Sequence, residues 1–122
     1  MSRITVSSGS PFEDRVGYAR AVRSGPLVVV AGTTAPGDGP AEQTREALRR
    51  IEAALAEAGA TLSDVIRTRM FVTDISRWEE VADVHAEVFG AIRPVATMVE
   101  VSALISPELL VEIEVDAYVF SF

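Results

Sequence analysis

Two stretches of the chain repeat their apolar residues at helical spacing. The first lies between Pro40 and Gly59, and its apolar residues recur every three or four positions. They are Ala47, Leu48, Ile51, Leu55 and Ala58. Pro40 suits the first turn of a helix, and Gly59 suits the left-handed position after its end. This pattern predicts an amphipathic helix between the two residues.

The second helical stretch begins at Ser76, which with Glu79 has the spacing of a capping box, and ends near Gly90. Its apolar stripe consists of Val81, Val84, Val88 and Phe89. Five other stretches are rich in β-branched residues and bounded by turn residues, as is typical of strands. They are residues 15–23, 27–34, 64–73, 95–102 and 110–120. The first two flank Ser24-Gly25-Pro26, which predicts a hairpin.

The last predicted strand alternates apolar and polar positions along its whole length. One side carries Val111, Ile113, Val115, Ala117 and Val119, which is typical of a side that faces the core. The other side carries Glu112, Glu114, Asp116, Tyr118 and Phe120. Three carboxylates beside two aromatic rings suit a wet, partly enclosed surface such as a subunit interface better than a second dry core. If both predicted helices pack their apolar stripes against one face of a mixed sheet, the polar side of the last strand is left uncovered on the other face.

Composition narrows the possible partners. The 122 residues contain no internal repeat or linker, so we expect a single domain over residues 1–122. A net charge of −7 disfavours nucleic acid, whose binding depends on Lys and Arg at phosphates. No apolar run approaches the ~20 residues that span a bilayer, so we expect no membrane partner. The polar first twelve residues lack the features of a secretory signal, which leads us to expect a cytoplasmic protein.

Four segments in a fixed order extend through nearly the whole chain. They are V-V-V-A-G-T at 28–33, A-E-Q-T-R-E-A-L-R-R-I-E-A-A-L-A-E-A-G-A at 41–60, D-V-I-R-T-R-M-F-V-T-D at 64–74 and V-E-I-E at 111–114. Together they resemble the reactive intermediate deaminase (Rid) family, also called the YjgF family. The resemblance implies an α+β, chorismate-mutase-like fold with a mixed sheet of about six strands and two helices packed on one face. It also implies a homotrimer that binds small molecules in clefts between subunits.

The best known activity of that family is hydrolysis of reactive imines and enamines to ammonia and a keto acid. The resemblance implies that Glu112 matches the glutamate associated with the reacting water and that Tyr18 matches the tyrosine that closes the cleft. The deaminases place a carboxylate-binding arginine where this chain has Ala96, and small polar or thiol residues where it has Ala31 and Met98. Losing such a charge pair typically costs about 2–5 kcal/mol. We therefore expect a divergent Rid protein with an altered substrate.

Three further residues are candidates for substrate binding, and each has a structural alternative. Arg69 and Arg93 could anchor an anion in place of the absent arginine, or they could form structural ion pairs. His85, the only histidine, lies within the apolar stripe of the second helix, where it could move a proton or simply be a satisfied core or interface residue. Glu112 itself could belong to a cross-strand ion pair rather than to a reaction centre.

Two functions therefore remain open at the level of sequence. One is an imine or enamine hydrolase with a non-standard substrate, and the other is a non-catalytic trimer that binds a metabolite or regulates a partner. The chain has no cysteine and one histidine, so we expect no metal site, and we expect no cofactor. Members of the family have also been described as endoribonucleases, but the acidic charge argues against a surface that binds phosphates.

Overall fold

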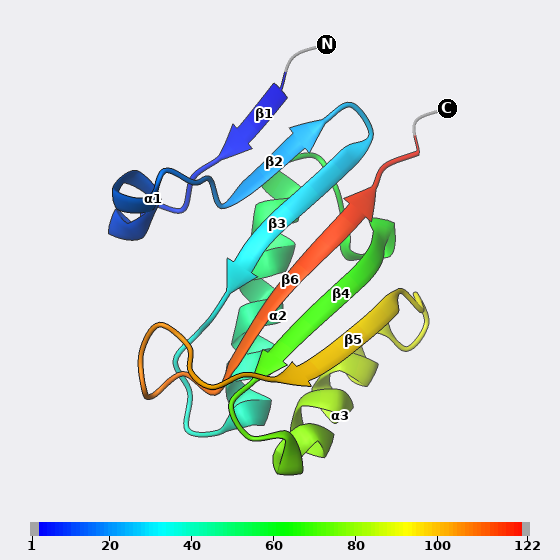
Figure 1. Cartoon of the computed structure of the whole chain (residues 1–122). Coiled ribbons are helices and arrows are strands. Elements are labelled where there is room, and N and C mark those ends of the chain that lie inside the picture. Colours follow the sequence, from blue (N-terminus) through cyan, green and yellow to red (C-terminus); the bar gives the residue numbers. More distant parts are fainter. Residues whose placement is uncertain (1–2, 121–122) are drawn as a thin grey trace.

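A computed structural model describes residues 3–120, which form a mixed sheet with its two longer helices behind one face (Figure 1). The strands are β1 (Arg3–Val6), β2 (Ala21–Ser24), β3 (Leu27–Thr33), β4 (Val65–Val72), β5 (Val95–Glu100) and β6 (Val111–Tyr118). The α-helices are α1 (Pro11–Val16), α2 (Pro40–Glu57) and α3 (Trp78–Phe89). The sheet order is β1-β2-β3-β6-β4-β5, and only β4 and β5 are parallel neighbours. The predicted fold class is confirmed.

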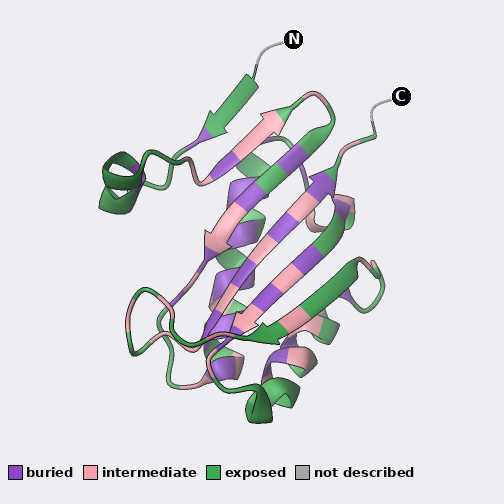
Figure 2. Cartoon of the chain, viewed as in Figure 1, coloured by how far each residue is buried: buried purple, intermediate pink, exposed green. Residues whose placement is uncertain are grey.

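The core lies between the sheet and the helices α2 and α3. All five apolar residues predicted for the first helix are buried, four of them in α2 and Ala58 as the residue that caps its end. The buried members of the α3 stripe are Val81, Val84 and Phe89. Val88 is partly exposed and packs against the core. The buried side of β6 consists of Val111, Ile113, Val115 and Ala117, so the alternation predicted for this strand is confirmed (Figure 2). This central strand fixes which side chains of its neighbours face the helices.

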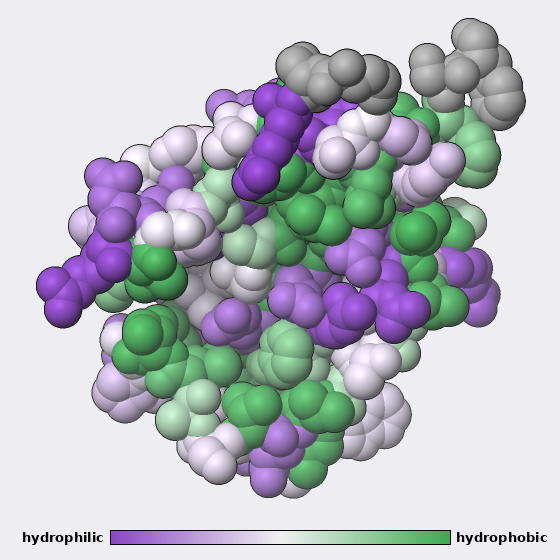
Figure 3. Space-filling model, turned by 45° about the horizontal axis from the view of Figure 1, so that its top comes forward, coloured by the Kyte–Doolittle hydropathy of each residue, from purple (hydrophilic) through white to green (hydrophobic). Residues whose placement is uncertain are grey.

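The opposite face of the sheet is not covered by any element of the described chain. It carries partly exposed apolar residues among charged ones, as the space-filling view shows (Figure 3). The exposed apolar residues of this face are Leu27, Val29, Val95, Val99 and Tyr118. We call it the open face. The carboxylates of β6 lie on it, half-buried, as the sequence predicts.

The N-terminal region differs from the prediction. Residues 15–23 do not form one strand, because Ser10 caps a short helix, Pro11 begins it, and Gly17 ends it in the left-handed region at φ 89°. The strand begins only at Ala21, and its hairpin to β3 is confirmed. The β1 strand was not predicted, since it is four residues long and exists through its pairing with β2. None of the helices within residues 3–120 is long and apolar enough to cross a membrane.

One local prediction about a helix end is wrong and another is confirmed. The Ser76 side chain does not cap α3, because the Asp74 side chain accepts the Ser76 N–H at 3.0 Å and caps a 3₁₀ turn that precedes the helix. The β4 strand bulges between Val65 and Arg67, which leaves Ile66 half exposed. Gly59 follows α2 with φ 80°, as predicted, so that the helix ends in a left-handed cap.

Candidate functional site

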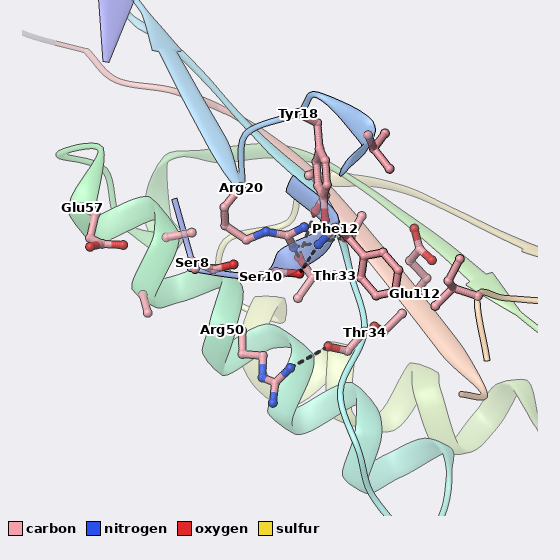
Figure 4. A pocket seen from close by; sticks show the side chains of 17 residues that line it. Ser8, Ser10, Phe12, Tyr18, Arg20, Thr33, Thr34, Arg50, Glu57 and Glu112 are labelled. Atoms are coloured by element: carbon pink, nitrogen blue, oxygen red, sulfur yellow. Dashed lines mark hydrogen bonds between the residues drawn. The ribbon is translucent and has the colours of Figure 1, made fainter. Parts of the chain in front are cut away.

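A pocket of about 860 Å³ lies where α1, the end of β3 and α2 approach one another (Figure 4). Its walls come from five parts of the chain. They are the loop Ser8, Gly9 and Ser10 with α1 residues Phe12 and Val16; Tyr18 and Arg20; Ala31, Gly32, Thr33 and Thr34; the α2 residues Arg50, Ala53, Ala54 and Glu57; and Ile105 with Glu112. The pocket thus combines apolar side chains with two cations and two carboxylates.

A bulge in β3 positions the carboxylate of Glu112. Val30 pairs with Val115 and Thr33 pairs with Ile113, so residues 31 and 32 together oppose a single residue of β6. At this bulge the Glu112 carboxylate lies directly against Gly32, where a Cβ atom would overlap with Oε2. Glycine at position 32 is therefore what lets the Glu112 side chain lie across β3.

Glu112 is half-buried, and its surroundings disfavour its charge. Burial raises the pKa of the Glu112 carboxyl above its usual range, and the nearby charge of Glu114 raises this pKa further. The guanidinium of Arg20 acts in the opposite direction and lowers the pKa. A carboxyl group with a raised pKa is a stronger base once ionised, which is the property that proton transfer near neutral pH requires.

Arg20 and Tyr18 come from the segment between α1 and β2. The Arg20 backbone N–H donates to the Val6 carbonyl at 2.8 Å, and its carbonyl accepts from the Ala31 N–H at 2.9 Å. Its Nη1 donates to the Gly32 carbonyl at 3.1 Å and to the Thr33 Oγ1 at 2.8 Å. The guanidinium carbon lies 5.7 Å from the centre of the Tyr18 ring, within the range of a cation–π contact.

The loop wall of the pocket is held by Glu13, a buried residue of α1. Its carboxylate accepts from Ser7 Oγ at 2.8 Å and from the Ser8 N–H at 3.0 Å, and it also accepts from Ser8 Oγ. These hydrogen bonds, those of Ser8 first, lower the pKa of the Glu13 carboxyl. The loop before α1 is therefore fixed by an ionised carboxylate.

Glu112 and Tyr18 are the two predicted site residues that line this pocket. Arg69 lies on the open face, where its Nη1 is 3.2 Å from a Glu114 carboxylate oxygen and 3.5 Å from one of Asp116. Arg93 precedes β5 at a left-handed φ of 61° and donates from Nε to the Gly90 carbonyl at 2.7 Å. In a single chain neither arginine lines the pocket that contains Glu112.

His85, Ala96 and Met98 belong to the helix-covered side of the sheet. Ala96 pairs with Thr68 and Met98 pairs with Met70 in the parallel β4–β5 ladder, so each shares the face of its buried partner. His85 Nε2 lies 2.8 Å from the Thr68 Oγ1, and its ring centre lies 4.8 Å from that of Phe89. Burial lowers the pKa of His85. These contacts favour the structural alternative for His85.

Arg20 and Gly32 are among the pocket residues that the sequence interpretation did not select. Arg20 carried no signal, because its environment depends on the path of the chain between α1 and β2. Gly32 could have been found, since an isolated glycine within a strand pattern often marks a bulge or a close approach. Within residues 3–120 no cluster of three or more His, Asp or Glu side chains could hold a metal ion.

The fold and site define a class of protein: a small α+β subunit with an open sheet face and a pocket built around one half-buried carboxylate. The sequence profile of the family described as Endoribonuclease L-PSP matches residues 10–119. The chain therefore belongs to this family, which is also known as the YjgF or Rid family. The resemblance inferred from the four sequence segments is confirmed.

Individual relatives agree with this assignment. A crystal structure of a member of the YjgF/YER057c/UK114 family from Mycobacterium tuberculosis is 73% identical, with a TM-score of 0.96, over 97% of this chain and 100% of that one. An uncharacterised protein from Streptomyces coelicolor is 42% identical over 93% of this chain and 90% of its own. A RutC family protein from Pyrococcus abyssi is 34% identical over 83% of this chain and 85% of its own.

Proposed function

We propose that this protein hydrolyses small reactive imines or enamines and that it works as a homotrimer. The observation that carries the proposal is the position of Glu112, a half-buried carboxylate with a raised pKa, in a pocket that also contains Tyr18. Membership of the Rid family supports the choice of reaction, because imine hydrolysis is the best known activity there. No metal or cofactor is needed for this chemistry.

In the proposed reaction Glu112 acts as a general base. Its carboxylate takes a proton from a water molecule while the water oxygen attacks the carbon of the C=N bond and the electron pair of that bond moves to nitrogen. The nitrogen of the resulting adduct takes up two protons, one from Glu112 and one from solvent water. The C–N bond then breaks as the Glu112 carboxylate accepts the hydroxyl proton and returns it to solvent, so that a carbonyl compound and ammonia are released. Tyr18 closes the pocket and limits the access of bulk water.

The substrate is proposed to differ from the simple 2-imino acids that the deaminases of the family accept. The supporting feature is Ala96, which offers a methyl group where those enzymes have a guanidinium, as expected for a divergent subgroup. Ala96 lies on β5, one of the two edge strands of the sheet, and is exposed. In the proposed trimer, Ala96, Met98 and Arg93 of one subunit border the pocket of its neighbour, as the family resemblance implies.

The test uses freshly generated imines and measures carbonyl product and ammonia against the spontaneous rate. Glu112→Gln is expected to lower kcat/KM by about 10²- to 10⁴-fold, the usual contribution of a general base. Tyr18→Phe keeps the ring and serves as the milder variant. The substrates are 2-iminopropionate and imines of neutral or esterified amino acids. If no imine reacts faster with the wild-type protein than with Glu112→Gln, the hydrolase proposal is wrong.

The second candidate is a non-catalytic trimer that binds a metabolite, and the loss of the arginine at Ala96 is the feature that favours it. A thermal shift against a panel of metabolites separates the two functions. Stabilisation by a ligand that is recovered chemically unchanged, together with no imine turnover, supports the binding protein. Turnover that depends on Glu112 excludes it.

A further inference from the structure

We propose that His85 donates a hydrogen bond from Nδ1 to an uncharged carbonyl oxygen of the ligand, next to Ala96 on the helix-covered side of β5. In the proposed trimer this part of one subunit borders the pocket that contains Glu112 of its neighbour, so the inference names a substrate class for that site. It rests on the proposed function for the place of the ligand and for its turnover, whereas the free donor is a property of the single chain.

The imidazole of His85 is held through one of its two nitrogens. Nε2 lies 2.8 Å from Oγ1 of Thr68, a fully buried residue of β4, and the ring packs against Phe89. Nδ1 makes no hydrogen bond to any residue within 3–120. It is also not enclosed, because Arg20 Nε is the only buried side-chain nitrogen or oxygen without a partner in that part of the chain. The contacts that hold His85 in place therefore leave Nδ1 within reach of solvent or a ligand.

The hydroxyl group of Thr68 decides which nitrogen of His85 carries the proton. The Thr68 oxygen has no hydrogen-bond partner other than His85 among the described residues. A buried hydroxyl group without an acceptor for its proton would cost free energy, so Thr68 donates to Nε2. The neutral imidazole then carries its own proton on Nδ1. The accessible nitrogen is therefore a hydrogen-bond donor.

The surroundings of this donor favour an uncharged ligand group. Burial lowers the pKa of His85, and no charged side chain is among the causes, so the ring is neutral near pH 7. No carboxylate within residues 3–120 lies in ion-pair distance of the ring. A carboxylate bound here would lose water without gaining a cation, whereas the oxygen of an amide, ester or ketone needs only the donor.

Ala96 leaves this donor accessible from the edge of the sheet. It pairs with Thr68 and lies on the same face one strand further out, about 5 Å away. The β5 strand is an edge strand, and α3 lies behind it (Figure 1). Ala96 is exposed and His85 is partly exposed, so a side chain as short as a methyl group does not close the site.

The other side chains around His85 are apolar. Trp78 and Ala82 precede His85 by seven and three residues and so share its face of α3. Trp78 is half exposed although its ring is large, and Met98 follows Ala96 on the same face of β5. An apolar strip with a single fixed donor suits a ligand that has an apolar body and one carbonyl group. For the proposed reaction, such substrates are imines that carry an amide, ester or ketone group in place of a carboxylate.

The experiment observes His85 directly, because it is the only histidine of the chain. Nuclear magnetic resonance of isotope-labelled protein reports the protonation of each ring nitrogen. The probes are 2-oxobutanamide, an uncharged amide without a C=N bond, and 2-oxobutanoate, the acid of the same shape. The free ring is expected to carry its proton on Nδ1, and only the amide should shift the Nδ1 signal. A ring protonated on Nε2, no shift with the amide, or equal shifts with both probes would overturn the proposal.

His85→Gln keeps a polar partner for Thr68 and removes the outer donor. In calorimetry it should bind 2-oxobutanamide about 3- to 10-fold more weakly than wild-type protein does, which is the usual share of one uncharged hydrogen bond, with binding of the acid unchanged. His85→Asn should recover part of the loss, because its amide takes the place of the Nδ1–H group. Asp83→Asn, at an exposed position of the same helix, is the control and should leave both affinities unchanged.

A purely structural role of His85 predicts a different result. His85→Gln would then unfold at lower urea concentration and weaken both probes equally. In that case Thr68→Val decides, since it keeps the shape of the buried side chain and removes the hydroxyl group that selects the tautomer. It should move the ring proton towards Nε2 and weaken binding of the amide. An unchanged tautomer and unchanged amide binding in Thr68→Val exclude the proposed donor.

Two further variants separate this inference from the proposed function. Glu112→Gln should lose turnover and still show the shift of His85, and a shift in a protein without any turnover leaves the inference standing and removes the reaction. Imine turnover that His85→Gln does not change, without a shift of His85, has the opposite meaning. Single chains obtained with Val29→Glu on the open face should lose amide binding, and single chains that keep it overturn the place of the ligand beside the neighbour's Glu112.

Discussion

At the scale of single residues, the pocket depends on how Glu112 is held and charged. The carboxylate lies against Gly32, is half-buried, and has Glu114 and Arg20 as its charged neighbours. The identity of Glu112 as a candidate came from the sequence, but the causes of its raised pKa did not. They depend on side chains that the β3–β6 pairing brings together.

The pH dependence of the reaction should follow the pKa of Glu112, which burial raises first and the charge of Glu114 raises further. A general base works as a carboxylate, so kcat/KM falls as the pH drops below the raised pKa of Glu112. Glu114→Gln removes one cause of that raised pKa, and the acid limb of the pH profile should therefore move to lower pH. Asp116→Asn is the matched control, because Asp116 also pairs with Arg69 but is not a cause of the shift. An acid limb at the same pH in the wild type and in Glu114→Gln would contradict the assignment.

Gly32→Ala should lower activity without unfolding the protein. The new Cβ would overlap with the end of the flexible Glu112 side chain, which can swing away at little cost in stability. A displaced base is expected to lower kcat/KM by about 100-fold. Gly39→Ala is the control, since its Cβ would meet only Arg77 Nη2 at 3.6 Å. Equal activity of Gly32→Ala and the wild type, at equal thermal stability, would show that the position of Glu112 is unimportant.

At the scale of elements, the local patterns predicted the long helices well and the N-terminal region poorly. The α2 helix begins at Pro40 and is followed by Gly59 in the left-handed region, as predicted. Proline at a helix start and glycine after a helix end act within one or two turns, so the local sequence is enough to predict them. The α1 helix and β1 strand are short, and their existence depends on the Glu13 hydrogen bonds and on pairing with β2. Short elements of this kind have too few residues to show a period.

Glu13→Gln should loosen the pocket wall before α1. The variant loses the charge that Ser7 and Ser8 stabilise, so the backbone amides of residues 7–12 should exchange hydrogen faster while those of β6 stay protected. Since the folded-state pKa of Glu13 is lowered, its contribution is present above its ordinary pKa and is lost as the pH falls through the lowered value. Asp14→Asn, on the same helix, is the control. Unchanged exchange in Glu13→Gln would show that Glu13 does not hold the loop.

At the scale of the whole molecule, the open face is the main unpaired surface in the described part of the chain. It combines exposed apolar residues with charged ones. Subunit interfaces have a similar composition, with an apolar centre surrounded by polar residues. The open face was foreseen from the alternation of the last strand alone. In the proposed trimer, neighbouring subunits cover the open face.

Sedimentation should detect a particle of three chains, each of 13.1 kDa. Val29→Glu places a charge among the apolar residues of the open face, opposite Asp116 in the strand register, and should shift the particle towards single chains. Ala86→Glu adds the same charge on an exposed position of α3 and should leave the assembly intact. A wild-type protein that sediments as a single chain would contradict the trimer.

The sequence by itself determined the order of the long elements, the core-facing side of β6 and the family. These features depend on residues that are close together in the chain, because helix and strand periodicity and turn residues act over a few neighbouring positions. Only the tertiary structure decided which side chains share a pocket. The bulge that admits Glu112 beside Gly32, and the position of Arg20 next to it, arise where β1, β3 and β6 meet. They depend on pairing between segments that lie far apart in the chain.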